Sequence, residues 1–373
     1  MPTTGLMRRT LASAAAQADM ASMLAPPKSS LEQSVTGYGQ PLAIARWLYA
    51  VAALVVLMVI VGGITRLTES GLSITEWKPI TGALPPLNEA AWAQEFALYR
   101  ATPEYQQINH GMSMADFQFI YFWEWAHRLL GRVIGLAFAL PLVWFAIKRA
   151  IPAGYGARLV ALLALGGMQG VVGWWMVTSG LTLRTDVSHY RLAVHLCLAL
   201  FILGALVWTA RDMVALHGNR AIRPAPLRRG VAVALLLLTV QLFWGAFTAG
   251  LDAGYAFSSW PLMGSEIFPA ATPMLSPWAL NLVDNPILVQ FIHRWWAFVA
   301  AGAMIWLGVQ AMRAGERDGG RVLHGLIVLQ IVLGIATLMS GVELWIAVAH
   351  QAVGALIVAA AAWCGHAAGL RGR

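Results

Sequence analysis

Residues 118–147 read QFIYFWEWAHRLLGRVIGLAFALPLVWFAI, a mostly apolar run that contains one histidine, His127. About 20 residues of helix, each rising about 1.5 Å, cross the ~30 Å hydrocarbon core of a bilayer. The run is therefore long enough to span a membrane as one helix. An ionisable side chain within such a span is costly and usually marks a functional site, so His127 is the first candidate functional residue.

The rest of the chain has the same apolar character. Hydrophobic residues make up 59% and charged residues only 11% of its 373 residues, whereas soluble domains average about 25% charged residues. We therefore predict an all-α integral membrane protein with eight transmembrane helices. The other seven apolar runs are 42–65, 157–178, 190–210, 231–250, 286–311, 322–340 and 344–366.

Basic residues predict the orientation of the helices, because cytoplasmic segments of membrane proteins are enriched in Lys and Arg. With the N-terminus inside, most of the 25 Lys and Arg fall in inner segments, and the loop 253–285 has none. Both termini are therefore expected in the cytoplasm, and the net charge of +8 reflects this topology rather than nucleic-acid binding. Residues 1–41 are predicted to form a disordered cytoplasmic tail, although their arginines and scarce acids also resemble a mitochondrial presequence.

The chain repeats itself as two four-helix units, 42–211 and 231–367, joined by a cytoplasmic linker 212–230 and followed by a short tail, 368–373. An even number of spans gives both units the same orientation. We expect two parallel four-helix bundles related by a pseudo-twofold axis along the membrane normal. The matched residues are Gly62, Thr65, Gly71 and Trp77 with Gly245, Thr248, Gly254 and Trp260; His127 and Arg128 with His293 and Arg294; Gln169, Gly173, Ser179 and Gly180 with Gln330, Gly334, Ser340 and Gly341; and His195 with His350.

The repeat sorts four intramembrane histidines into two matched pairs, all at the outer ends of their helices. A single histidine at such a place is more often a packed or interfacial residue than a ligand. Four at matching repeat positions favour ligands, because two helices that each aim one imidazole into a bundle supply the axial ligands of one haem iron. The sequence thus predicts two haem sites, with metal ligands His127 and His195 in one half and His293 and His350 in the other.

Charged residues beside the histidines are further candidates. Haem propionates need cationic partners at the water interface, and Arg suits carboxylates, although lipid headgroups attract the same side chains. Glu124 lies one turn before His127, and its counterpart in the second half is Gln290. A carboxylate there could orient His127, act as a base or form a salt bridge. The candidate propionate partners are Arg128, Arg132, Arg191 and Arg294.

Several motifs together resemble those of the haem A synthase family, and the similarity runs from about residue 42 to the last helix. Cys197 and Cys364 are too far apart for a disulfide, and the sequence lacks an outer-loop cysteine pair. That absence resembles the alphaproteobacterial and mitochondrial type of the family. The strings that carry the resemblance are GGITRLTESGLSITEWKPITGALPP (62–86), FIYFWEWAHRLLGR (119–132), GWWMVTSGL (173–181), YRLAVHL (190–196), GAFTAGLDAG (245–254), SWPLM (259–263) and FIHRWWA (291–297).

The resemblance implies an oxidoreductase that converts a porphyrin methyl of haem O to a formyl group, through a hydroxymethyl intermediate, giving haem A for terminal oxidases. By the same resemblance, His293 and His350 hold a resident haem b. His127 and His195 hold the substrate haem, and Glu124 is needed for activity. Expected partners are the lipid bilayer, haem O synthase, terminal oxidase assembly factors and a second copy of the chain. The expected location is the bacterial inner membrane, with the mitochondrial inner membrane as the alternative.

Two other functions fit part of the pattern. A transmembrane dihaem b-type cytochrome would place its haems on opposite sides of the membrane, whereas all four histidines lie on one side. A transporter with parallel repeats should have polar residues at the midplane, but the inner halves of these spans are nearly all apolar. For the enzyme, a haem ligated on both faces has no open position. Either one histidine of the His127 and His195 pair dissociates, or electrons are removed and water attacks the methyl carbon.

Overall fold

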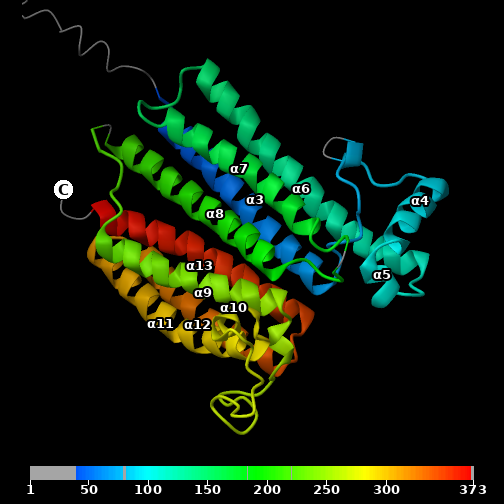
Figure 1. The fold of residues 1–373 in the computed structure, drawn as a ribbon. Coiled ribbons are helices and arrows are strands. Elements are labelled where there is room, and N and C mark those ends of the chain that lie inside the picture. The colour runs from blue at the N-terminus through cyan, green and yellow to red at the C-terminus, as the bar shows by residue number, and fades with distance from the viewer. Residues whose placement is uncertain (1–38, 79–80, 183, 220, 371–373) are drawn as a thin grey trace, which may run out of the picture.

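The computed structural model describes residues 39–78, 81–182, 184–219 and 221–370, and this part of the chain is helical. Eight helices in it are long and apolar enough to cross a membrane, which confirms the predicted number of spans (Figure 1). They are α3 (Pro41–Leu67), α6 (Met114–Ile147), α7 (Gly156–Val177), α8 (His189–Gly218), α9 (Arg229–Gly250), α11 (Pro286–Arg313), α12 (Arg317–Met339) and α13 (Leu344–Leu370).

The first four of these helices pack as one bundle and the last four as another. Helices α3 and α8 of the first bundle face α9 and α13 of the second. The start of α3 and the end of α13 lie at one end of the molecule, and the longer loops lie at the other, here called the loop end (Figure 1). The parallel repeat itself stays a prediction.

A continuous apolar core joins the two bundles away from the loop end. It includes the fully buried side chains of Ile44 and Leu48 on α3, Leu203 on α8 and Met304 on α11. By contrast, large apolar side chains such as that of Leu140 on α6 are exposed, as expected of a surface that faces lipid rather than water. The core thus anchors the helices at the end opposite to the four histidines.

The two bundles differ in width. In the second bundle α11 packs closely on α13, its diagonal neighbour, as well as on α9 and α12. In the first bundle the equivalent diagonal helices, α6 and α8, are not among the closely packed pairs, and α3 instead packs extensively on α8. The first bundle is therefore more open across the diagonal that carries His127 and His195.

Several helices extend further than the apolar runs predicted. Helix α8 continues to Gly218. Its buried Asp212 side chain accepts a hydrogen bond from the backbone N–H of Ala225 and forms an ion pair with Arg158, and these contacts hold this part of the helix in place. The connection to α9 is therefore shorter than the predicted linker 212–230. Helix α13 runs into the predicted tail 368–373 as far as Leu370. Most of the other predicted tail, residues 1–38 of 1–41, lies outside the described residues.

The loop end also holds short helices that the apolar pattern did not predict. The loop between α3 and α6 contains α4 (Glu89–Arg100) and α5 (Pro103–Gln107). They pack an aromatic cluster, including Tyr99 and Tyr105, against Phe117 at the start of α6. The shorter loop of the second half holds the 3-10 helices η2 (Ala253–Tyr255) and η3 (Trp278–Leu280) and the one-turn helix α10 (Asn281–Asp284). Both loops join helices at the end of their bundle that carries the histidines.

Candidate functional site

Each of the four histidine rings lies against a glycine of a neighbouring helix. A Cβ atom on Gly173, Gly245 or Gly334 would lie 2.9 Å from Cε1 of His195, His293 or His350, respectively. A Cβ atom on Gly62 would lie 3.2 Å from Nε2 of His127. Non-bonded carbon atoms prefer about 3.5–4.0 Å. Glycine is therefore required at these positions to leave room for an imidazole between the helices.

The four contacts between histidine and glycine occur at matched positions of the predicted repeat. This agreement supports the repeat. Each pair of histidines comes from the diagonal helices of one bundle, α6 with α8 and α11 with α13. His127 and His195 thus belong to one bundle, and His293 and His350 belong to the other. The two members of each predicted pair therefore lie in the same bundle, and their pairing around an iron stays a prediction.

Three of the rings also contact a glutamine, a feature that the sequence reasoning missed. The amide Nε2 lies 3.2 Å from Nδ1 of His195 for Gln169, 3.1 Å from Nδ1 of His293 for Gln241, and 3.4 Å from Nε2 of His350 for Gln330. Gln169 and Gln241 also donate to the backbone carbonyl of the same histidine. The repeat match of Gln169 with Gln330 was the signal that could have revealed two of them; Gln241 has no matching glutamine.

Glu124 is buried and fully engaged with the loop that follows α3. Its Oε2 accepts hydrogen bonds from the hydroxyl of Ser73 and from the backbone N–H of Ile74, both at 2.7 Å. Its Oε1 forms an ion pair with Arg128 at 2.7 Å. Arg128 in turn donates to the carbonyls of Ile74 and Glu76. The salt bridge is therefore present, and it fastens the loop above the first bundle.

In the second half, Gln290 and Arg294 hold the loop that follows α9 through hydrogen bonds to its backbone carbonyls. Gln290 donates to the carbonyls of Gly254 and Phe257, and Arg294 donates to the carbonyl of Phe257 and to those of the next turn. The fastening thus does not require a carboxylate. The negative charge at Glu124 is therefore one difference between the two halves.

The remaining predicted arginines lie at the loop end of the first bundle. Arg132 donates to the carbonyl of Lys78, whose ammonium has a raised pKa because Glu76 and Glu95 form ion pairs with it. Arg191 donates to the carbonyl of Trp175 and stacks over its ring. A cavity of about 350 Å³ opens beside it, lined by Thr178, Ser179, Thr182, Arg184, Ser188 and Arg191. Two guanidinium groups and several hydroxyls in one cavity suit a carboxylate ligand.

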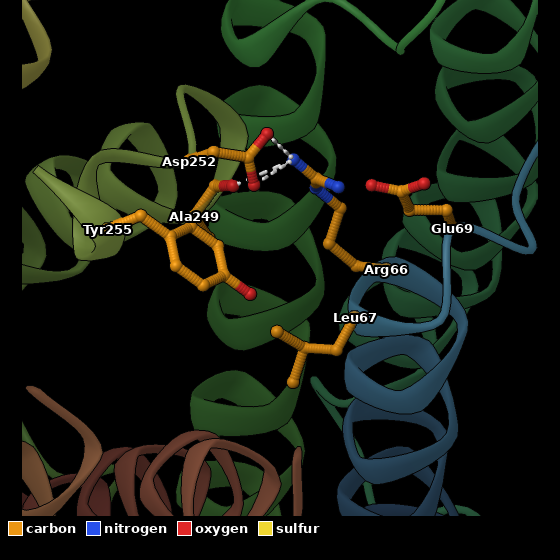
Figure 2. A pocket seen from close by; sticks show the side chains of 6 residues that line it. All are labelled: Arg66, Leu67, Glu69, Ala249, Asp252 and Tyr255. Atoms are coloured by element: carbon orange, nitrogen blue, oxygen red, sulfur yellow. Dashed lines mark hydrogen bonds and ion pairs between the residues drawn. The ribbon is translucent and has the colours of Figure 1, made fainter. Parts of the chain in front are cut away.

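A second cavity, of about 320 Å³, lies at the junction of the two bundles and is lined by residues of both (Figure 2). Arg66 at the end of α3 forms an ion pair with Asp252 at 2.9 Å and donates to the carbonyl of Ala249. Glu69 points toward the guanidinium from the other side (Figure 2). This cavity is lined by none of the four histidines, and its ion pair connects the two bundles.

The donor set fits haem iron better than a metal ion held by protein alone. The described residues contain no group of three or more His, Cys, Asp or Glu side chains that could hold a metal. Paired imidazoles in apolar bundles, spaced by glycines, suit an iron whose other four ligands come from a porphyrin. His189, the other histidine near the first site, pairs with Asp284 at 3.0 Å instead. Both cysteines are free, as predicted.

Comparison with known proteins agrees with this fold and donor set. Residues 45–362 match the family model described as cytochrome oxidase assembly protein (COX15-CtaA). The chain is 54% identical over 332 residues to a haem A synthase of Sphingopyxis alaskensis, which covers 89% of this chain and 94% of that protein. It is 53% identical over 329 residues to one of Rhizorhabdus wittichii, covering 88% and 94%. A haem A synthase of Novosphingobium aromaticivorans is 52% identical over 339 residues, covering 88% and 96%.

Proposed function

The chain belongs to the haem A synthase family of cytochrome oxidase assembly proteins, and we propose that its two bundles divide the work of the reaction. It is a multi-pass membrane oxidoreductase that acts on a methyl group of haem O, and haem A is the product. The matched contacts between histidine and glycine in both bundles carry the proposal, because they make room for one bis-histidine site in each.

In this proposal the second bundle holds a resident haem b through His293 and His350. Such a haem supplies an electron-transfer centre when bound. The chain's own contribution is rigidity: α11 and α13 pack closely on each other, and Gln241 and Gln330 each contact one of the two rings. A closely packed, doubly fixed pair suits a cofactor that stays in place.

The first bundle holds the substrate haem through His127 and His195. Its greater width across α6 and α8 suits a ligand that must enter and leave. The loop that follows α3 is held to α6 at this end of the bundle by Glu124 and Arg128. Glu124 is also the one buried negative charge that distinguishes this site from the other, so it can stabilise positive charge that develops on the substrate.

The arginines divide into two groups by their contacts. Arg128 and Arg294 donate hydrogen bonds to backbone carbonyls of the loops, so their main role is to hold these loops in position. Arg191 borders the polar cavity of about 350 Å³, and with Arg184 it would bind the propionates of the substrate haem. Arg132 donates to the carbonyl of Lys78 in the loop between α3 and α6, and it would bind a propionate at the loop end of the first bundle.

In the bacterial inner membrane we expect the loop end outside and both termini in the cytoplasm, because the basic residues favour that orientation. Haem O synthase would deliver the substrate, and oxidase assembly factors would take the product. These docking partners, and self-association, stay predictions.

The test is to produce the chain in a bacterium that makes haem O but no haem A, and to separate the extracted haems by chromatography. Haem A in the membranes, with haem b in the purified protein, supports the proposal. His293→Ala and His350→Ala should remove the haem b spectrum, whereas His127→Ala should leave most of it and abolish haem A. Equal loss of haem b in all three variants would show that the two bundles are assigned the wrong way round.

A further inference from the structure

The ring of His127 is held differently from the other three. His195, His293 and His350 all turn Cε1 toward their glycine, with Nδ1 at 3.4–3.5 Å and Nε2 at 3.8 Å from the Cβ position. His127 instead turns Nε2 toward Gly62 at 3.2 Å, with Cδ2 at 3.5 Å. The three similar rings are the ones that contact a glutamine, so the different orientation coincides with the missing partner.

The sequence explains why His127 has no glutamine. Gln241, which contacts His293, lies four residues before Gly245 on α9, and the repeat offset of 183 residues places Met58 at the equivalent position of α3. The methyl group of Met58 lies near Gly131, one turn after His127. No hydrogen bond joins the His127 ring to another residue in the described part of the chain.

This difference matters for a ligand of iron. An imidazole that gives one nitrogen to iron keeps its proton on the other, and that N–H normally has a partner that fixes the ring and raises its basicity. The Oε1 atoms of Gln169, Gln241 and Gln330 are all buried without a partner, so rotation of each amide provides an acceptor. A methionine sulfur accepts only weakly, and its side chain is flexible.

We propose that His127 is the exchangeable ligand of the first bundle, held to iron more weakly than His195, His293 and His350. The inference rests on the proposed function, in which these histidines hold haems. It specifies that the His127 side of the substrate haem is the side that opens, and that Met58 is the positioning residue responsible. In the second bundle each histidine ring contacts a glutamine, Gln241 at Nδ1 of His293 and Gln330 at Nε2 of His350, so neither ring is without a partner.

The experiment exchanges the two residues and measures carbon monoxide binding by the reduced, haem-loaded protein, since the gas binds only where an axial ligand yields. Met58→Gln should lower the affinity of the first-bundle haem for carbon monoxide by about 10- to 100-fold, the usual effect of a partner to a metal ligand. Met58→Leu, which also offers the His127 ring no strong hydrogen-bond acceptor, is the matched control and should leave the affinity for carbon monoxide within a few-fold of that of the unaltered protein. In the reciprocal variant, Gln241→Met, the resident haem b should begin to bind carbon monoxide.

Extraction of the haems from each variant separates the two levels of the proposal. If haem O or haem A is absent from the loaded protein, the proposed function fails before the exchangeable ligand is tested. If both haems are present and Met58→Gln binds carbon monoxide as well as Met58→Leu does, the inference is wrong. If Met58→Gln does not fold, Gln241→Met decides alone: haem b that is retained and still does not bind the gas overturns the inference.

Discussion

At the scale of single residues, the absence of a side chain at four glycines shapes the site as much as the four histidines do. The four glycines beside the histidines leave the volume that an imidazole occupies, and at Gly334 the three atoms nearest to the Cβ position all belong to the His350 ring. Another glycine of the same helix, Gly325, has open space around it. Substitutions at Gly334 and Gly325 therefore distinguish the loss of space beside a histidine from the general effect of replacing a glycine within a helix.

Gly334→Ala is expected to displace the His350 ring and to remove most of the haem b from the purified protein. The control Gly325→Ala should retain haem b and should be slightly more stable, because Ala is favoured over Gly in a helix by about 1 kcal/mol. The measurement is haem b per protein from the absorption spectrum. Equal haem b in both variants would contradict the tight contact.

Glu124→Gln is expected to lower haem A formation sharply while the protein stays folded and keeps haem b. An amide offers one acceptor oxygen for the contacts that the carboxylate makes with Ser73, Ile74 and Arg128. Its NH2 group would also face one of those donors. Loss of a charge-stabilising group typically costs about 10²–10³-fold in rate. Haem A and accumulated haem O are measured together with bound haem b.

Ser73→Ala is the matched control for that prediction, because it removes one hydrogen bond to Glu124 and keeps the charge. A partial loss of haem A would show that the hold on the loop matters as well as the charge. Near-normal haem A in Glu124→Gln would reduce the residue to a structural salt bridge.

At the scale of helices, length and apolarity were enough to predict the eight spans, because a membrane imposes both. The ends were predicted less well where polar contacts decide them. Helix α6 begins at Met114, before its apolar run, because Ser113 and Asp116 form a capping box. The glutamine contacts were missed because they depend on how two helices are rotated against each other, which the apolar pattern does not specify. The short helices α4 and α5 carry no span-length signal.

Helix α5 contains a buried acid, Glu104, and burial raises its pKa to about 8. A carboxyl whose pKa is raised in the folded state binds its proton more tightly there than when unfolded. It therefore favours folding below its ordinary pKa and loses that contribution as pH rises toward 8. The stability should fall across this window by at most about 1.4 kcal/mol per pH unit.

The thermal midpoint in detergent is therefore expected to decrease from pH 5 to pH 8.5, and Glu104→Gln should flatten the decrease. The exposed Glu89→Gln on α4 serves as the control and should leave the slope unchanged. A variant at position 104 with the slope of the unaltered protein would show that another group is responsible.

At the scale of the whole molecule, each bundle contains four long helices, and the two bundles differ in how closely their diagonal helices pack. The second is packed across its diagonal, and the first is not. The same difference appears in the contacts of individual residues, since only the first bundle has a histidine without a glutamine and a buried carboxylate beside it. This difference suits the proposed division between a resident cofactor and a substrate that enters and leaves.

The predicted topology places both ends of the chain in the cytoplasm. A fluorescent protein fused after Arg373 should therefore fluoresce, because it folds there, whereas alkaline phosphatase fused after Ala270 should be active outside. Phosphatase activity from the C-terminal fusion would reverse the orientation and, with it, the side of the membrane on which the four histidines lie.

The bridge between Arg66 and Asp252 has a consequence for the ancestry of the chain. The offset of 183 residues makes Asp252 the counterpart of Glu69, and both have a left-handed backbone, with φ of 51°. The counterpart of Arg66 is Ala249, so the present molecule forms the bridge once. A single-unit ancestor that carried both the arginine and the acid would have formed it twice, as a symmetric dimer. In the present chain, the single ion pair between Arg66 and Asp252 connects the two halves directly.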